Sequence, residues 1–185
     1  VSLGDVVVVI GAGPVGCMLA ELAKVMGAKK TIITQRSKTR LEMAKSFDID
    51  VVISATEEDV TQRVLDETDG LGADVVLTAT STLEAQEQAL PLIKKRGRIN
   101  LFAGLPKGTK PLVLDSNILH YKEAYLFGSH GSVPKHHRIA LELLSAGRIK
   151  PKKYISHNFS LDQIIDAFQT VERREGMKVI VNPMS

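Results

Sequence analysis

Three glycines at a fixed spacing form the clearest chemical pattern in this sequence. Gly11, Gly13 and Gly16 directly follow the apolar run Val6-Val-Val-Val-Ile10, and Pro14 stands just inside the next segment. Glycine permits torsions and close approaches that a Cβ atom would block. Proline in a first helical turn gives up only an amide that has no intrahelical acceptor. A helix beginning here would point amides and a partial positive charge at a ligand, which suits a pyrophosphate.

The residues on either side of the glycines supply the context that this chemistry needs. The run of β-branched residues has no polar face, which predicts a central parallel strand covered on both sides. Beyond the glycines, apolar residues recur at helical spacing at Val15, Leu19, Leu22 and Met26, and Gly27 is placed to end that helix. The order strand, glycine turn, helix predicts dinucleotide binding. The alternative is a glycine-rich turn without a ligand.

A second pattern, about 20 residues beyond Gly16, bears on which dinucleotide is bound. An acidic residue usually takes the adenosine ribose hydroxyls of NAD at the end of the second strand, which we expect at 31–34. This sequence has Gln35 there, and Arg36 follows. A neutral amide does not repel a 2′-phosphate, and a guanidinium can grip one with paired hydrogen bonds. The pattern therefore favours NADP, with NAD as the alternative.

The helix that follows carries a local argument in the same direction. Ser37 is a suitable N-cap for a helix at 37–47, which places Lys38 and Arg40 in its first turn. Positive charge there opposes the helix dipole, and a bound phosphate would relieve that conflict. The alternative is that these long side chains simply extend into water.

Short strands and helices alternate along the rest of the chain. This alternation predicts βαβ units with right-handed crossovers, and hence an α/β Rossmann fold with a doubly wound, six-stranded parallel sheet and helices on both faces. The expected later strands are 51–53, 74–78, 97–102, 123–128 and a short final strand at 178–181, and the expected helices are 59–68, 84–93, 134–146 and 161–173, with a helical turn at 117–121.

Ligands of such sheets lie above the carboxyl ends of the strands. The turns after the fifth and sixth strands are therefore expected to contact the nicotinamide end of the cofactor. These turns hold Ala103, Gly104 and Leu105, and Ser129, His130 and Gly131.

Composition excludes several other classes of function. The chain has 185 residues, a formal net charge of +3 and no run of five like charges, which argues against a nucleic-acid tail or a membrane patch. No signal peptide or membrane-length apolar stretch is present, so we expect a cytoplasmic protein. With Cys17 as the one cysteine and no ligand-spaced cluster, we expect neither a disulfide nor a metal site in this chain.

Taken together, several segments resemble the medium-chain, zinc-dependent alcohol dehydrogenases, and most closely their sorbitol or polyol dehydrogenase branch. The resemblance extends over nearly the whole chain. The segments that carry it are Gly4-Asp-Val-Val-Val-Val-Ile-Gly-Ala-Gly-Pro-Val-Gly16, Arg40-Leu-Glu-Met-Ala-Lys45, Leu101-Phe-Ala-Gly-Leu-Pro106, Tyr121-Lys-Glu123, Leu143-Leu-Ser-Ala-Gly147, Ala167-Phe168 and Met177-Lys-Val-Ile-Val181.

The resemblance implies roles for individual residues. Val15 would lie under the pyrophosphate, and Lys178 would be a basic residue near the cofactor phosphates. Gln35 occupies the place of the ribose-binding Asp of NAD-using members, and Arg40 matches an adenosine-side Arg. The two nicotinamide-side turns match the family's backbone segments. The departure at Gln35 puts NAD use in doubt and resembles NADP-using relatives.

The resemblance also implies what this chain does not supply. Family members hold zinc in an upstream catalytic domain, which is absent here, so we expect no catalytic residue in this chain and no turnover by it alone. The expected reaction of the full-length enzyme is hydride transfer between nicotinamide and an alcohol, polyol or ketone. Residues 1–185 would form one dinucleotide-binding domain, with the segment from about 150 to 185 packing toward the catalytic domain.

Family members also pair subunits through the edge of the sixth strand, so a homodimer or homotetramer is expected. Two alternatives to the dehydrogenase remain open. One is a non-catalytic dinucleotide-sensing module, and the other is a zinc-free quinone or enoyl reductase of the wider family. The sequence upstream of Val1 would distinguish them by the presence or absence of zinc ligands.

Overall fold

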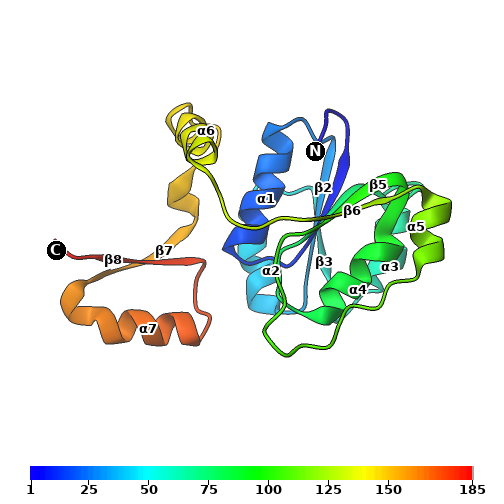
Figure 1. Cartoon of the computed structure of the whole chain (residues 1–185). Coiled ribbons are helices and arrows are strands. Elements are labelled where there is room, and N and C mark those ends of the chain that lie inside the picture. Colours follow the sequence, from blue (N-terminus) through cyan, green and yellow to red (C-terminus); the bar gives the residue numbers. More distant parts are fainter. Residues whose placement is uncertain (185) are drawn as a thin grey trace. The chain divides into compact units, whose positions relative to one another are not determined.

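A parallel sheet of six strands organises the first of two compact units in this chain (Figure 1). The computed structural model describes residues 1–184; the first unit covers Val1–Gly131, and the second begins at Ser132. The strand order is β3-β2-β1-β4-β5-β6. The strands are β1 (Val6–Ile10), β2 (Lys30–Gln35), β3 (Val51–Ser54), β4 (Ala73–Thr78), β5 (Ile93–Leu101) and β6 (Tyr125–Gly128).

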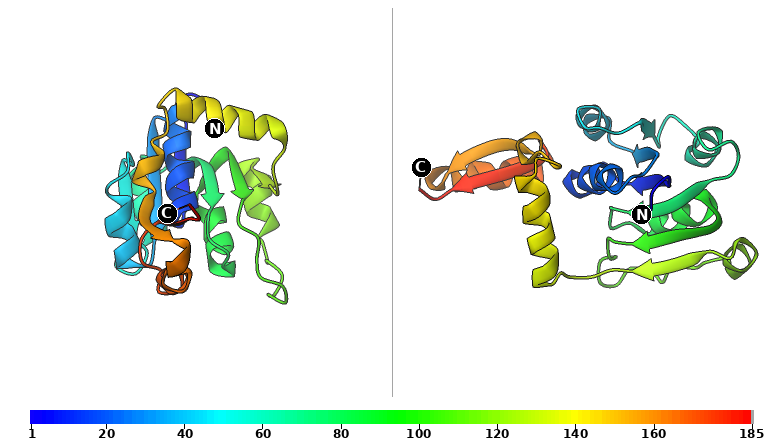
Figure 2. Two further views of the ribbon diagram at one scale, coloured as in Figure 1. Left: turned by 90° about the vertical axis from the view of Figure 1, so that its left-hand side faces the viewer. Right: turned by 90° about the horizontal axis from the view of Figure 1, so that it is seen from above.

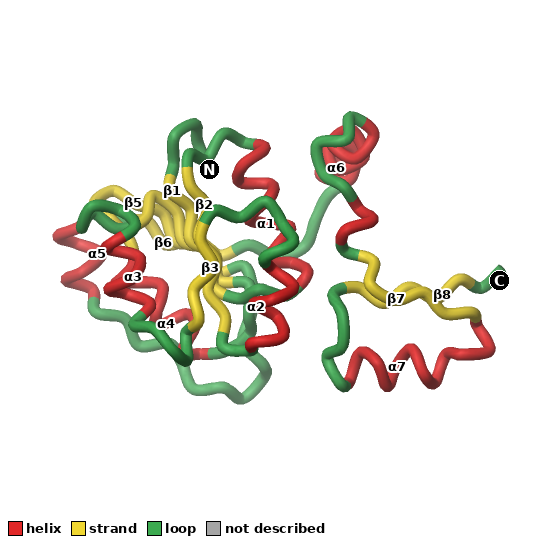
Figure 3. The backbone as a smooth tube through the Cα atoms, turned by 180° about the vertical axis from the view of Figure 1, so that it is seen from behind, coloured by secondary structure: helices red, strands yellow, loops and turns green. Residues whose placement is uncertain are grey.

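Helices cover both faces of this sheet, which confirms the predicted Rossmann architecture (Figure 3). On one face lie α1 (Pro14–Val25) and α2 (Lys38–Ala44); on the other lie α3 (Val60–Asp66), α4 (Leu83–Leu92) and α5 (Ser116–Lys122). Among residues 1–184, no helix combines the length and the apolar character needed to cross a membrane.

The core forms because β1 is buried along its whole length, as its β-branched sequence predicts. Alternate residues of a strand face opposite sides. Val6, Val8 and Ile10 belong to the cluster that includes Val60 of α3 and Ala89 of α4. The interior is aliphatic and densely packed, consistent with a sequence that has no Trp.

The packing face of α1 differs from the predicted apolar stripe. The helix is buried through its small residues, among them Gly16, Cys17 and Ala20, whereas Val15 and Met26 are 43% and 50% exposed. The reason is that α1 lies close to the strands, and only small side chains fit between the backbones. The helix itself is confirmed, and Gly27 follows it with φ +96.

The start of β5 also differs from the prediction. We expected the fourth helix to continue to Ile93 and the strand to begin at Gly97, but β5 already begins at Ile93. Pro91 lies inside α4 near its end, and Arg96 adopts a left-handed φ of 60. Proline removes a helical amide donor, so the helix stops within the next residues.

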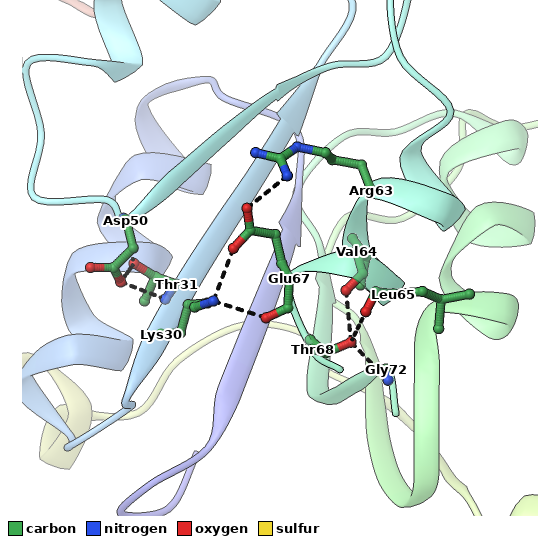
Figure 4. Close-up of polar contacts among 9 residues, drawn as sticks. All are labelled: Lys30, Thr31, Asp50, Arg63, Val64, Leu65, Glu67, Thr68 and Gly72. Atoms are coloured by element: carbon green, nitrogen blue, oxygen red, sulfur yellow. Dashed lines mark hydrogen bonds and ion pairs between the residues drawn. The ribbon is translucent and has the colours of Figure 1, made fainter. Parts of the chain in front are cut away.

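An ion pair and hydrogen bonds join the first residues of β2 to the segment after α3 and to the residue before β3, at the amino end of the sheet (Figure 4). Glu67 contacts the Lys30 Nζ through Oε2 at 2.9 Å and the Arg63 Nη1 through Oε1 at 2.8 Å. Nearby, the Asp50 Oδ2 accepts hydrogen bonds from the Thr31 amide at 2.7 Å and the Thr31 hydroxyl at 3.0 Å. The hydrogen bond from Lys30, together with the nearby charge of Arg63, lowers the pKa of Glu67 despite its desolvation.

The second unit has a small sheet of its own (Figure 2). It contains α6 (Pro134–Ser145), β7 (Ile155–Ser160), α7 (Ile164–Glu172) and β8 (Lys178–Asn182), with 3-10 turns at Pro151–Lys153 and Leu161–Gln163. Strands β7 and β8 pair in parallel, as the right-hand view of Figure 2 shows. The sequence did not predict β7, because its Ser, His and Asn residues have little strand preference.

We predict that Glu67→Gln lowers the free energy of unfolding by about 1 kcal/mol at pH 7, because both ion pairs are partly exposed. The folded-state pKa lies below the ordinary value of 4.5. The stabilisation is therefore present above that value and is lost as the pH falls through the folded pKa. Urea unfolding of both proteins at pH 7 and at pH 3 measures this difference.

Glu42→Gln is the matched control, because the Glu42–Lys45 pair is largely exposed. It should leave the unfolding free energy nearly unchanged at both pH values. An equal loss for Glu67→Gln at pH 7 and pH 3 would contradict the assignment.

Candidate functional site

The carboxyl edge of the six-stranded sheet brings together most of the residues selected from the sequence. After β1, β4 and β5, the first loop residue extends the sheet by one backbone hydrogen bond to the neighbouring strand. The amide of Gly11 donates to the Thr34 carbonyl at 2.8 Å, that of Ala79 to the Ile10 carbonyl at 2.8 Å, and that of Ala103 to the Thr78 carbonyl at 2.9 Å. The strands β1 to β3 are added in one direction across the sheet and β4 to β6 in the opposite direction, so the order reverses between β1 and β4. Open α/β sheets bind ligands at such a switch point.

The first and third glycines of the turn are required by packing. Gly11 has φ +112, and a Cβ atom there would lie 3.2 Å from the carbonyl oxygen of Ala79. At Gly16 the constraint is absolute, because a Cβ atom would lie 1.8 Å from the Gly11 oxygen. The start of α1 therefore rests directly on the turn that leaves β1.

The second glycine differs from the other two. A Cβ atom at Gly13 would meet no atom within 4 Å, so this position faces open space. Gly13 is the N-cap of α1, with an ordinary φ of −75, and the first turn contains Pro14 and no acidic residue. The amides of Val15 and Gly16 belong to this first turn, where helical geometry supplies no acceptor. A helix N-terminus with free first-turn amides and room at its N-cap residue is the arrangement that binds a pyrophosphate in dinucleotide-binding folds.

The end of β2 places Gln35 and Arg36 beside this turn, because β1 and β2 are paired up to the register Ile10–Thr34. The Gln35 Oε1 accepts hydrogen bonds from the amides of Arg36 at 2.8 Å and Ser37 at 3.4 Å. Its oxygen is thus used within the loop, which leaves the Nε2 donor for a ligand. Arg36 is exposed and forms no ion pair with the residues between Val1 and Met184.

Of the positive charges predicted in the first turn of α2, that of Lys38 is paired within the protein. Ser37 is the N-cap, as expected, and its Oγ accepts from the Arg40 amide at 3.4 Å. Lys38 pairs with Glu57 at 2.6 Å, and the hydrogen bond to Glu57 raises the pKa of Lys38. Glu57 therefore neutralises the charge of Lys38 without a bound phosphate, and the exposed guanidinium of Arg36 is suited to bind one.

The charge of Arg40 acts on Cys17 of α1. Burial raises the pKa of Cys17 to about 12, Glu21 adds to this, and the charge of Arg40 partly opposes it. The thiol is therefore protonated and unreactive at neutral pH. Arg40 is half-buried, in contrast to Arg36.

Side-chain hydrogen bonds reinforce the turns after β5 and β6. The Gln86 Nε2 on α4 donates to the carbonyl of Ala103 at 3.1 Å, and the Ser129 Oγ donates to the Asn100 Oδ1 at 3.0 Å. Ala103 and Ser129 are among the residues predicted from the sequence, whereas their partners Gln86 and Asn100 are not. No local pattern marks these two, since their partners are distant in the chain.

For the remaining predicted cofactor-binding residues, the structure shows the element that holds each of them but no contact with a cofactor. Lys178 is the first residue of β8 in the second unit. Gly104, Leu105, His130 and Gly131 lie in the two turns, and their contacts with cofactor stay predictions. Within residues 1–184, no group of three or more His, Cys, Asp or Glu side chains is placed so that it could hold a metal ion.

Known proteins similar to this chain are dehydrogenases. Sorbitol dehydrogenase from Halalkalibacterium halodurans is 32% identical over 189 residues, and D-arabitol-phosphate dehydrogenase from Enterococcus avium is 32% identical over 185 residues. These alignments cover 100% and 97% of this chain but 53% and 51% of the relatives. The chain therefore spans about half the length of the curated relatives it matches.

Solved structures give the same result. An alcohol dehydrogenase from Thermus sp. ATN1 is 32% identical, with a TM-score of 0.88, over 98% of this chain and 52% of that one. A zinc-binding dehydrogenase from Sinorhizobium meliloti 1021, bound to NADP, is 26% identical, with a TM-score of 0.90, over 98% of this chain and 53% of that one. An E. coli CFT073 alcohol dehydrogenase complexed with NADH is also 26% identical, with a TM-score of 0.87, over 98% and 53%.

The family assignment rests on more than half of the chain. A sequence profile for zinc-binding dehydrogenases matches residues 14–146. This range begins at the first helix after the glycine turn and includes the turns after β5 and β6. The resemblance found in the sequence is confirmed: this chain belongs to the zinc-binding dehydrogenase family.

Proposed function

We propose that this chain is the cofactor-binding part of an NADP-preferring dehydrogenase that acts on an alcohol or polyol. The observation that carries the proposal is the N-terminus of α1, which begins directly after the glycine turn at the switch point of the sheet and has room at its N-cap residue Gly13. A dinucleotide bound there would exchange a hydride at its nicotinamide ring with a secondary alcohol or the corresponding ketone.

The chain's own residues would bind and orient that cofactor. The amides of Val15 and Gly16 would donate to the pyrophosphate, whose charge the helix dipole favours. The turns at 103–105 and 129–131 would border the nicotinamide end through their backbone groups. None of these residues reacts, so the chain contributes affinity and position.

The preference for NADP rests on two neighbouring residues. The Gln35 side chain is neutral and has a donor left for a ligand, and Arg36 is an exposed cation without an ion-pair partner in the described chain. Relatives are known with either cofactor: the S. meliloti structure is bound to NADP and the E. coli structure to NADH. Relatives with this fold therefore bind either cofactor, and we assign the choice in this chain to Gln35 and Arg36.

The other parts of the reaction belong to protein outside this chain. We infer that the zinc ligands and the substrate pocket lie in a catalytic half outside this chain, since the chain spans about half the length of its relatives. The second unit would pack toward that half: its α7–β8 surface leaves an apolar hollow of about 180 Å³ lined by Phe168, Val171 and Val179, among others. A cytoplasmic location stays a prediction.

The outer edge of β6 would join two copies of the protein. Tyr125 and Phe127 stack on each other there, with ring centroids 6.1 Å apart, and both side chains are about half exposed. An exposed sheet edge offers unpaired backbone groups to another strand. We infer a homodimer, or a tetramer built from such dimers.

A dehydrogenase assay of the full-length protein tests the proposal as a whole. A panel of polyols and secondary alcohols with NADP and NAD should give turnover that is faster with NADP. Binding without turnover on any substrate would favour a dinucleotide sensor. Turnover only with quinones or enoyl compounds would favour the zinc-free reductase.

We predict that Gly13→Asp abolishes NADPH binding while the fold is retained or slightly stabilised. Asp is a preferred N-cap and favours the dipole of α1, but its side chain would occupy and repel the pyrophosphate. Loss of at least about 100-fold in affinity, or 2.7 kcal/mol, is expected. Fluorescence titration and thermal unfolding measure the two effects.

Two further variants separate the causes. Gly13→Asn fills the same space without charge and should weaken binding less than Gly13→Asp. Gly16→Ala should instead destabilise the protein, because its Cβ atom would lie 1.8 Å from the Gly11 oxygen. Normal NADPH binding by both Gly13 variants would exclude a pyrophosphate site at the start of α1.

We predict that Arg36→Ala costs about 1–3 kcal/mol of NADPH binding, the range for hydrogen bonds to charged groups. NADH binding should change little, since NADH has no 2′-phosphate. Isothermal titration with both cofactors measures the difference. The control is Lys45→Ala, which removes the cation at the C-cap of α2 that is already paired with Glu42. Equal losses for NADPH and NADH, or tighter NADH binding by the unaltered protein, would overturn the NADP preference.

We predict that replacing Tyr125 and Phe127 together by Lys yields monomers whose NADPH affinity is unchanged. Charged side chains on an edge strand oppose pairing with another edge. Sedimentation velocity measures the state of assembly. Leu71→Lys, at another exposed apolar residue, is the control and should leave the oligomer intact. An oligomer that survives the double substitution would place the subunit contact elsewhere.

A further inference from the structure

Gln86 is a buried polar side chain on the otherwise apolar inner face of α4. It is 5% exposed, and the other buried residues of this helix are Ala85, Ala89, Leu90 and Leu92. Its Nε2 donates a hydrogen bond to the carbonyl oxygen of Ala103 at 3.1 Å, across 17 positions of sequence. A buried amide is costly unless it is paired, so this hydrogen bond accounts for the residue type at this position.

The second polar group of Ala103 is also held by the fold. Its amide donates to the carbonyl of Thr78, the last residue of β4, at 2.9 Å. Ala103 is therefore fastened on both sides: its amide to the sheet edge and its carbonyl to α4. With both ends fixed, the peptide plane that leads into Gly104 has a defined orientation.

The residue that follows is open to a ligand. A Cβ atom at Gly104 would meet no atom within 4 Å, as at Gly13 in the pyrophosphate turn. The backbone of Gly104 is therefore accessible, while its direction depends on the peptide plane that Gln86 holds. Loop peptides are otherwise among the more mobile parts of a fold.

We infer that Gln86 is a positioning residue for the nicotinamide half of the cofactor. By holding the Ala103 carbonyl, it orients the peptide group that joins Ala103 to Gly104, whose amide then faces the nicotinamide carboxamide, a group that can both donate and accept hydrogen bonds. The inference rests on the proposed function, and it assigns Gln86 no contact with the cofactor. Only the nicotinamide end depends on it, because the adenosine and pyrophosphate contacts come from β2 and α1.

Comparison of two ligands tests this role. NADPH contains the nicotinamide, whereas 2′-phospho-ADP-ribose has the same adenosine, 2′-phosphate and pyrophosphate without it. Gln86→Met preserves the length and helix preference of the side chain and removes the donor. We expect NADPH to bind about 5- to 10-fold more weakly to this variant, as for one lost hydrogen bond, with no change for 2′-phospho-ADP-ribose.

A second variant guards against a purely structural effect. Gln86→Glu keeps the shape but turns a carboxylate toward the Ala103 carbonyl, so its loss of NADPH affinity should exceed that of Gln86→Met. Gln88→Met, a half-buried position on the same helix, is the matched control and should bind both ligands normally. Thermal unfolding of each variant, and the emission of bound reduced nicotinamide, accompany the titrations.

The outcomes separate this inference from the proposed function. If the unaltered protein binds neither ligand, the proposed function fails and the inference fails with it. If it binds both, two results overturn the positioning role alone: Gln86→Met weakens both ligands equally, or it weakens neither. A selective loss of NADPH affinity, with altered nicotinamide emission, supports it.

Discussion

The close approach of Gly16 to the carbonyl of Gly11 is the constraint on which the site depends. No Cβ atom fits between them, so the first turn of α1 lies directly over the turn that leaves β1. This contact sets the height of the helix above the sheet edge and leaves the space at Gly13 open. The same closeness explains why α1 is buried through Gly, Cys and Ala residues rather than through its larger apolar side chains.

A second feature extends this arrangement along the whole edge. Successive loops attach to the final carbonyl of a neighbouring strand, so the turns after β1, β4 and β5 form one continuous platform. Side chains from behind the platform hold its peptides, as Gln86 does for Ala103. The two basic side chains near the end of β2 differ in their pairing. Lys38 forms an ion pair within the protein, whereas Arg36 forms none with the described residues.

Much of the fold could be predicted because its signals are local. The β-branched run of β1, the glycine spacing and the N-cap at Ser37 are each carried by residues a few positions apart. Alternation of strands and helices then restricts the topology, since parallel strands require right-handed crossovers. The prediction was weaker at element boundaries, as at the start of β5, and it missed β7, which depends on pairing with β8.

The sequence by itself determined the order of strands and helices in the six-stranded unit, its doubly wound sheet and the glycine turn, because periodicity and backbone freedom are properties of neighbouring residues. Only the tertiary structure decided which residues act together. It showed that Gly13 alone among the three turn glycines faces open space, that Glu57 neutralises Lys38, and that Gln86 holds Ala103. These are contacts between segments far apart in the chain, and their distances follow from the path of the folded backbone rather than from any local pattern.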